Sequence, residues 1–277
     1  MPYRDCYCSY DNMNNPNPHC EYETLKDYHE KKEDRERETC KTRKQAVDKS
    51  WSKHDIKNAF MREGVPLSDL CHGIFRMMPP ELLHTTSEGT TEYMLETLKH
   101  IIGDDVVGKR LCNVIETLHH TVHNDLKRNS DKDIPRGTAR TGLLKNTLVN
   151  VNERRGNLFR LLCLSHTDRA QNWLFPCLKK NGIDPQNFLE CIKLYLSMEE
   201  WFHRTNSKVE MQSARPLIAH VIQLVHEVFP RTKGNGWNLP KTHGLTKMQY
   251  YMCLFGSAIN FFGGPGECNH KKNCKGY

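Results

Sequence analysis

Two residues near the end of the chain have types and a spacing that suit metal and phosphate chemistry. Glu267 and His270 stand three positions apart, and Lys271 follows directly. On a helix, residues at this spacing share a face. A carboxylate and an imidazole can then contribute to a divalent-metal site, and the adjacent lysine attracts phosphates. The spacing alone favours a simpler alternative, in which Glu267 stabilises a helix N-terminus, because this pattern is common by chance.

Cysteine and histidine side chains near the start of the chain suggest a second possible site. Zinc binds thiolates and imidazoles, and a metal here would close an Asn- and Pro-rich loop that has few apolar residues for a core. The Cys-x-Cys spacing is shorter than that of zinc ribbons and fingers, so free thiols are the alternative. The candidate zinc ligands are Cys6, Cys8, His19 and Cys20.

Basic residues are concentrated in the last part of the chain. Residues 231–277 contain seven lysines or arginines and one acid, whereas the first 230 residues are close to neutral within a total net charge of +7. Aromatic residues are interleaved with these bases, a composition that suits a phosphate backbone or another polyanion. An ordinary solvated surface over an aromatic core is the alternative. The candidate nucleic-acid contacts in this segment are Lys241, His243, Lys247, Lys271 and Lys272.

Composition excludes several classes of protein. No run in the 277 residues approaches the roughly 20 apolar residues of a membrane-spanning helix. The first residues lack the basic-then-apolar layout of a secretory signal, so we expect a protein that is not secreted. The 12 cysteines are not spaced like a disulfide scaffold, and several lie inside helical apolar patterns as small buried side chains. We therefore expect a reducing compartment, either nuclear or cytoplasmic.

The elements that would position these residues are predicted to be helices. Alternation of β-branched residues is almost absent, which predicts a mainly α fold with little strand. Residues 1–20 are predicted to form a Cys-bearing loop, 21–64 a charged helical segment laced by ion pairs, 65–230 a helical domain and 231–277 the basic segment. The predicted helices cover about 50–62, 79–102, 104–128, 153–166, 169–180, 185–203, 213–229 and 246–259.

Three blocks of the sequence resemble Plavaka-type transposases, which are cut-and-paste DNA transposases allied to the CACTA and Kyakuja–Dileera–Zisupton groups. The blocks run in family order and span almost the whole chain. The first is the Cys-bearing start, and the second is a Pro-acid-Leu-Leu-His block that ends in a glycine. The matching residues of the second and third blocks are Pro80, Glu81, Leu82, Leu83, His84 and Gly89, then Pro240, Lys241, His243, Phe255, Gly256, Glu267, His270 and Lys271.

The resemblance implies a specific chemistry. Such transposases have a ribonuclease-H-like core, in which two aspartates and one further acid hold two Mg²⁺ ions for in-line attack on phosphodiesters. It implies that Glu267 is the third carboxylate, that His270 contacts metal or phosphate, and that Lys241 and Lys271 clamp the DNA backbone, with His243 in the same motif. It also implies that both catalytic aspartates are missing. We therefore expect a fragment or remnant that binds DNA without being catalytically complete, nuclear if functional.

Two alternatives of other classes stay open. A helical protein-interaction or structural module with a zinc-stabilised N-terminus would need no nucleic acid. For the transposase fragment, by contrast, the apolar faces that would pack on the missing sheet would be exposed and would favour homo-oligomers. An independent metal-dependent nuclease would need a full carboxylate set, for which Asp104, Asp105 and Asp125 are the only crowded acids. These acids lie on a predicted helix among many other charged residues, which is more typical of surface positions.

Overall fold

A computed structural model of the protein describes residues 8, 10–18, 25–51, 79–103, 158, 161–162 and 168–263. Within these ranges every regular element is a helix and none is a strand, which confirms the predicted mainly α fold for this part of the chain. The same ranges contain no helix that is both long and apolar enough to cross a membrane. The likeness of residues 231–277 to part of a ribonuclease-H-like core stays a prediction.

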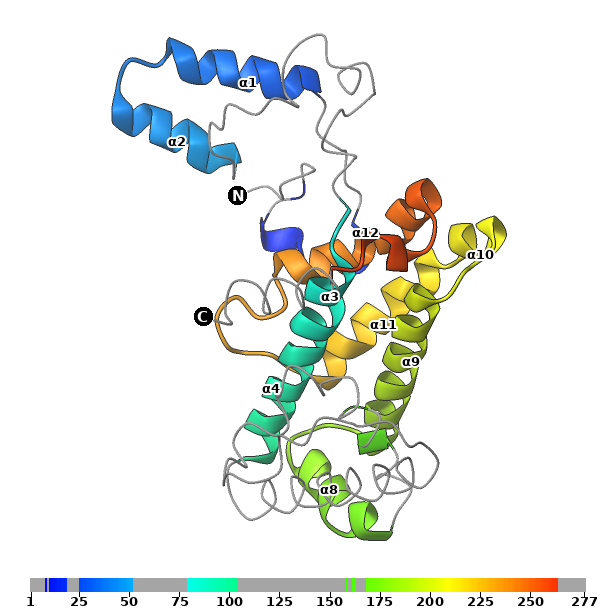
Figure 1. Cartoon of the computed structure of the whole chain (residues 1–277). Helices are drawn as coiled ribbons and strands as arrows, with labels where there is room; N and C mark the ends of the chain where they lie inside the picture. Colours follow the sequence, from blue (N-terminus) through cyan, green and yellow to red (C-terminus); the bar gives the residue numbers. More distant parts are fainter. Residues whose placement is uncertain are drawn as a thin grey trace, which may run out of the picture.

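The described elements carry the labels of Figure 1 and follow one another in chain order. They are η1 (Tyr10–Asn12), α1 (Leu25–Arg37), α2 (Lys41–Trp51), α3 (Leu82–Thr85), η5 (Thr86–Thr90), α4 (Thr91–Ile102), α8 (Asp168–Lys180), α9 (Pro185–His203), α10 (Lys208–Ser213), α11 (Arg215–Val228), α12 (Pro240–Phe255) and η6 (Ala258–Phe261).

The main core lies among α4, α9, α11 and α12. Helix α9 runs beside α11, and α12 contacts α3, η5, α10 and α11 (Figure 1). Each of the four helices contributes fully or almost fully buried side chains to one cluster, and burying one such side chain stabilises the fold by about 1.5–3 kcal/mol. Representative members are Leu95, Phe188, Phe202, Ile222 and Met248.

Side chains at the helix starts explain where α9 and α10 begin. The carboxylate of Asp184 accepts a hydrogen bond from the backbone N–H of Asn187 at 3.0 Å, and Pro185 occupies the first helical position, where its fixed φ is favourable. Helix α10 begins with a reciprocal capping box between Ser207 and Glu210, with hydrogen bonds of 3.2 and 2.8 Å. Short polar segments therefore fix the register of the helices that enclose the core.

Helix α12 begins earlier than the sequence pattern indicated. The predicted start at about residue 246 is wrong, because Pro240 occupies the first turn of the helix, and a proline there lacks only an N–H that would have no partner inside the helix. The helix ends at Phe255, before Gly256, whose φ of 82° favours glycine. The motif that carries Lys241 and His243 is thus the start of a helix.

Two other predicted helices are interrupted. The segment predicted as one helix over about 79–102 starts at Leu82 and contains a π-helical turn, η5, between α3 and α4. The segment predicted over about 213–229 is α11, with the separate helix α10 before it. The predicted helix at about 104–128 lies outside the described residues. Almost all of those at about 50–62 and 153–166 lie outside as well.

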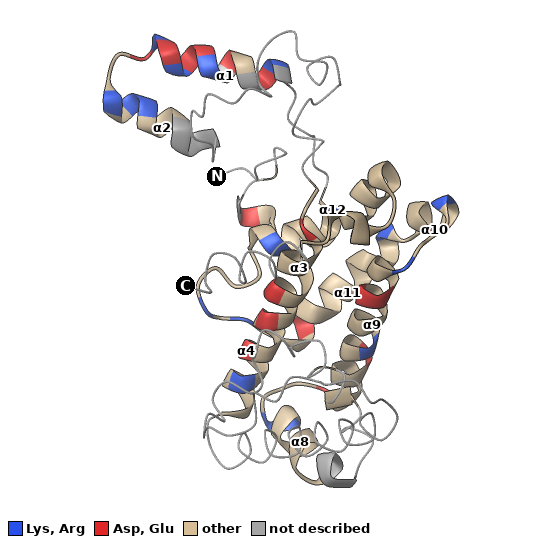
Figure 2. Cartoon of the chain, viewed as in Figure 1, with Lys and Arg blue, Asp and Glu red and all other residues tan. Residues whose placement is uncertain are grey.

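Helices α1 and α2 form a charged hairpin that stands apart from the core helices (Figure 1). Figure 2 shows acidic and basic positions interleaved along α1. Arg37 lies 3.2 Å from Glu33 and 3.4 Å from Asp34, and Lys26 lies 3.6 Å from Glu30. The predicted ion pairs between neighbouring turns are therefore confirmed in α1.

Candidate functional site

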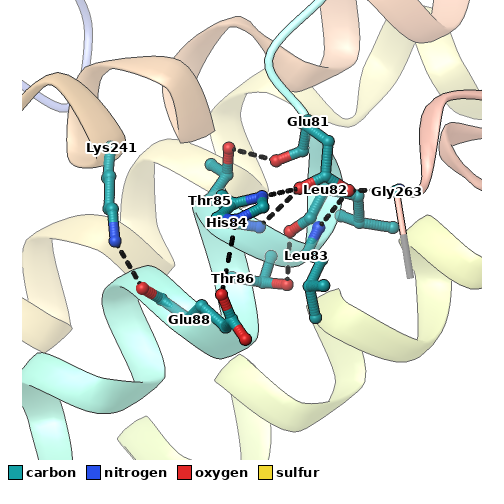
Figure 3. Close-up of polar contacts among 9 residues, drawn as sticks. All are labelled: Glu81, Leu82, Leu83, His84, Thr85, Thr86, Glu88, Lys241 and Gly263. Atoms are coloured by element: carbon teal, nitrogen blue, oxygen red, sulfur yellow. Dashed lines mark hydrogen bonds and ion pairs between the residues drawn. The ribbon is translucent and has the colours of Figure 1, made fainter. Parts of the chain in front are cut away.

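Glu81 connects the start of α3 with a residue far along the chain. Its carboxylate accepts hydrogen bonds from the backbone N–H groups of Leu83 at 2.9 Å and His84 at 2.8 Å, which caps the helix. The same carboxylate accepts a hydrogen bond from the backbone N–H of Gly263, 182 residues later. Figure 3 shows the three donors converging on Glu81. One side chain thus holds two segments together.

The imidazole of His84 lies between two carboxylates. Its Nδ1 is 2.5 Å from Oε2 of Glu81, and its Nε2 is 3.4 Å from Oε2 of Glu88 (Figure 3). These three side chains are partly exposed and occupy one face of α3 and η5. A ring nitrogen can donate a proton to either carboxylate, so the arrangement holds the ring in a fixed orientation.

Burial and hydrogen bonding oppose each other at Glu81. Burial works to raise the pKa of its carboxyl, but the N–H groups of Gly263, His84 and Leu83, together with the His84 ring, favour the ionised form. The net result is a lowered pKa. Glu81 is therefore a carboxylate at neutral pH, as a group that accepts several N–H donors requires.

The π-helical turn η5 receives the side chain of Lys241 from α12. The Nζ of Lys241 donates a hydrogen bond of 2.5 Å to the backbone carbonyl oxygen of Glu88 (Figure 3). It also lies 5.6 Å from the centre of the Tyr93 ring. A Cβ at Gly89 would collide with the carbonyl oxygen of His84 and would lie 3.0 Å from Cδ of Lys241. Glycine at this position thus gives the lysine room to reach the turn.

Threonine hydroxyl groups line the inner side of the same segment. The Oγ1 of Thr85 donates to the carbonyl of Glu81 at 2.6 Å, and that of Thr86 donates to the carbonyl of Leu82 at 2.8 Å. Such bonds to the preceding turn compete with regular helical hydrogen bonds. They accompany the local change from α-helical to π-helical backbone, a change often found at functional sites.

A buried polar contact joins α4 to α9 beneath this segment. The Oγ1 of Thr91 lies 3.0 Å from the hydroxyl of Tyr195 and donates a hydrogen bond of 3.3 Å to Oε1 of Glu199. All three residues are at most 1% exposed. Burial raises the pKa of Tyr195 well above its usual value, and the charge of Glu199 acts in the same direction. Tyr195 is therefore neutral and acts as a hydrogen-bonding group.

The structure places three of the predicted nucleic-acid contacts. Lys241 is half-buried and bonds to η5, as described above. His243 is 0% exposed and Lys247 is 5% exposed, both within α12. Both side chains lie in the interior of the described part of the chain. Their predicted role as DNA contacts stays a prediction.

The remaining predicted site residues lie outside the described residues. They are Glu267, His270, Lys271 and Lys272 at one end and Cys6, His19 and Cys20 at the other. Of the four candidate zinc ligands, Cys8 alone is described, and it is buried. Gly263, four positions before Glu267, is the last residue that the structure describes.

The described part of the chain contains no group of three or more His, Cys, Asp or Glu side chains that could hold a metal ion. At Glu81, His84 and Glu88 the imidazole contacts both carboxylates, so the three groups pair with one another instead of converging on a common point. The predicted zinc and magnesium sites therefore stay predictions.

The residue pattern contains a signal for this cluster. Glu81, His84 and Glu88 recur at helical intervals of three and four positions, which places them on one face. Tyr195 and Glu199 are likewise four positions apart, but nothing local indicates that Thr91 contacts them across more than 100 residues. Comparison of the chain with protein-family models, curated proteins and solved structures finds no match in any of the three.

Proposed function

We propose that this chain is a DNA-binding helical protein related to the cut-and-paste transposases that it resembles, and that its basic C-terminal segment contacts the phosphate backbone. The observation that carries the proposal is that residues of two separate resembling blocks meet. Lys241 from the third block bonds to Glu88 within the second block, 153 residues away. A chance likeness would give no reason for two such blocks to lie together.

The same cluster also contacts the chain shortly before the last residues of the third block. Glu81 binds Gly263, from which the chain continues toward Glu267 and the lysines that follow it. In our proposal the cluster is a base from which this basic segment extends. Contact with phosphates requires positive charge and carries no sequence information, so we propose binding to duplex DNA of any sequence.

Salt-dependent binding to duplex DNA tests this proposal. The affinity of the purified chain for a labelled duplex of arbitrary sequence, measured by fluorescence anisotropy, should fall linearly on a log–log plot against salt concentration. The double variant K271Q/K272Q should bind more weakly and should reduce the magnitude of the slope by about 2, because each lost phosphate contact removes about 0.9.

The matched control is K179Q/K180Q. It removes the same charge from two adjacent exposed lysines at the end of α8. We expect its slope to equal that of the unaltered chain. Binding that ignores salt, or an equal loss in both double variants, would contradict a role for the C-terminal segment.

The proposal assigns DNA binding but no strand cleavage. Cleavage in the resembled transposases relies on Mg²⁺ held by several carboxylates, and the implied contribution of this chain is the single residue Glu267. Incubation of supercoiled plasmid with the chain and Mg²⁺ or Mn²⁺ should leave it intact. Nicking that disappears in Glu267→Gln would show that this part of the proposal is wrong.

A further inference from the structure

Helices α1 and α2, which form the charged hairpin, are not part of the main core. They contribute no side chain to the hydrophobic cluster of the described residues. Among the described elements, the main neighbour of each helix is the other one (Figure 1). Packing of the core therefore does not explain which charged residues these two helices carry.

The two helices of the hairpin differ in their balance of charge. Acidic and basic residues are equal in number in α1, whereas basic residues predominate in α2. The bases of α2 are Lys41, Arg43, Lys44 and Lys49, and its acid is Asp48. Figure 2 shows basic positions gathered at the start of α2. Because an excess of positive charge attracts a polyanion, α2 is the helix of the hairpin that suits such a partner.

Two lysines of α2 differ from the other bases of the hairpin in their surroundings. Arg43 lies 3.9 Å from Glu38. By contrast, Lys41 and Lys44 form no ion pair with any side chain that the structure describes. They stand three positions apart and so share a face of α2, where Lys41 is exposed and Lys44 is partly exposed. This face therefore presents positive charge to solvent.

The backbone at the start of α2 also favours negative charge. The pKa of the exposed Cys40 thiol is lowered, because the backbone N–H groups of Arg43 and Thr42 donate hydrogen bonds to its sulfur. Desolvation and the charge of Glu38 act in the opposite direction, but the net result is a lowered pKa. The end of the helix that carries Lys41 therefore stabilises an anion.

We propose that Lys41 and Lys44 form a second contact of this chain with the phosphate backbone of duplex DNA. The identity of the partner rests on the proposed DNA binding, whereas the contact itself is independent of the C-terminal segment. The exposed neighbours Thr42 and Gln45 can also donate hydrogen bonds to phosphate oxygens. Interfaces with DNA are polar and positively charged, whereas the centres of protein–protein interfaces are apolar. The polar character of this face therefore favours DNA over an acidic protein.

Fluorescence anisotropy with a labelled duplex of arbitrary sequence tests this contact on the full, nuclease-treated chain. The double variant K41Q/K44Q should bind the duplex more weakly than the unaltered chain. The slope of log affinity against log salt concentration should be smaller in magnitude by about 2, because each lost phosphate contact removes about 0.9.

The matched control is K26Q/R37Q, which removes the same charge from the same hairpin. Lys26 and Arg37 lie in ion pairs with acids of α1, so the slope of this variant should equal that of the unaltered chain. Circular dichroism should show equal helix content in all variants. An equal loss of slope in the control would overturn the proposal.

The remaining outcomes separate this contact from that of the C-terminal segment. A slope that K271Q/K272Q lowers and K41Q/K44Q leaves unchanged would overturn the contact at α2 and leave the proposed function standing. Weaker binding in K41Q/K44Q alone would support the contact at α2 and contradict the C-terminal one. Absence of salt-dependent binding by the unaltered chain would overturn both. Binding to vesicles of anionic phospholipid that K41Q/K44Q abolishes, with an unchanged slope for DNA, would also overturn the contact at α2.

Discussion

The carboxylate of Glu81 lies where two parts of the chain meet. It caps α3, orients the ring of His84 and binds the backbone of Gly263. Hydrogen bonds to an ionised acceptor are stronger than neutral ones, and their loss leaves backbone donors without a partner. Glu81 is therefore the residue of the candidate site whose substitution should have the largest effect.

Glu81→Ala should lower the free energy of unfolding by about 2–4 kcal/mol, the sum of a lost helix cap and a lost bond to a charged group. Glu81→Gln should cost less, because it keeps one oxygen acceptor. Urea denaturation followed by circular dichroism measures both. The control is Glu190→Ala on the exposed side of α9. A loss in Glu81→Ala no larger than in this control would show that the Gly263 contact contributes nothing.

Single residues of the candidate site were partly predictable. Lys241 and His243 were selected from the sequence, but their surroundings were not, because burial depends on what a helix packs against. Lys247 illustrates the difference. A lysine in a basic segment is usually at the surface, yet this one lies on the side of α12 that faces the interior. Charge composition indicates how many basic side chains exist but not which of them reach solvent.

At the scale of elements, the π-helical turn η5 is the feature that shapes the site. It separates α3 from α4 and contains the carbonyl group that accepts the hydrogen bond from Lys241. The position of Gly89 inside this turn allows the close approach of α12. The geometry of the cluster therefore depends on a backbone irregularity of five residues.

Gly89→Ala should disrupt this turn. The added Cβ would meet the carbonyl oxygen of His84, which belongs to the backbone and cannot rotate away. We expect a loss of about 1–3 kcal/mol in the free energy of unfolding, typical of overpacking. Thermal or urea denaturation measures it. The second variant Gly89→Ala/Lys241→Ala should recover only a small part, since the carbonyl remains; full recovery would show that the lysine was the sole obstacle.

Most helices of the described ranges were predictable as elements, and their ends less so. The apolar periodicity of α9 predicted 185–203, which agrees with Pro185–His203. The start of α12 was missed, because the predicted start at about residue 246 did not take into account that a proline such as Pro240 suits the first turn of a helix. The turn η5 was missed because its threonines fit an ordinary helix equally well. The apolar periodicity of a sequence identifies regular helices. An irregular backbone such as η5 depends on contacts with residues far along the chain, which the local sequence does not indicate.

At the scale of the whole molecule, stability should depend on pH through two groups whose pKa values are lowered by folding. Burial lowers the pKa of His226 from 6.5 to about 4, against the opposite effect of the Glu227 charge, and the ring stacks on Trp237 with centres 5.3 Å apart. The hydrogen bonds to Glu81 lower its pKa from 4.5. In both cases the unfolded chain binds the proton more readily, so acid favours unfolding.

The free energy of unfolding should therefore fall as the pH drops below 6.5 toward about 4, where His226 titrates. We expect a loss of about 2 kcal/mol between pH 7 and pH 5. Urea denaturation at both values measures it. His226→Phe keeps the stacking and should remove most of the difference, whereas His220→Phe, at an exposed position of α11, should not. An unchanged pH dependence in His226→Phe would assign the effect to other groups.

Below pH 4.5 the protonation of Glu81 should add a further loss of free energy of unfolding.

The bond between Glu81 and Gly263 also sets an order of events during synthesis. A ribosome that adds 5–20 residues per second needs roughly 10–40 s to pass from one of these residues to the other. Throughout this interval α3 can form with its cap in place, while one acceptor site of the Glu81 carboxylate waits for a donor that has not yet been translated. The cluster is therefore completed only after Gly263 has been translated, when the whole of α12 has already been synthesised.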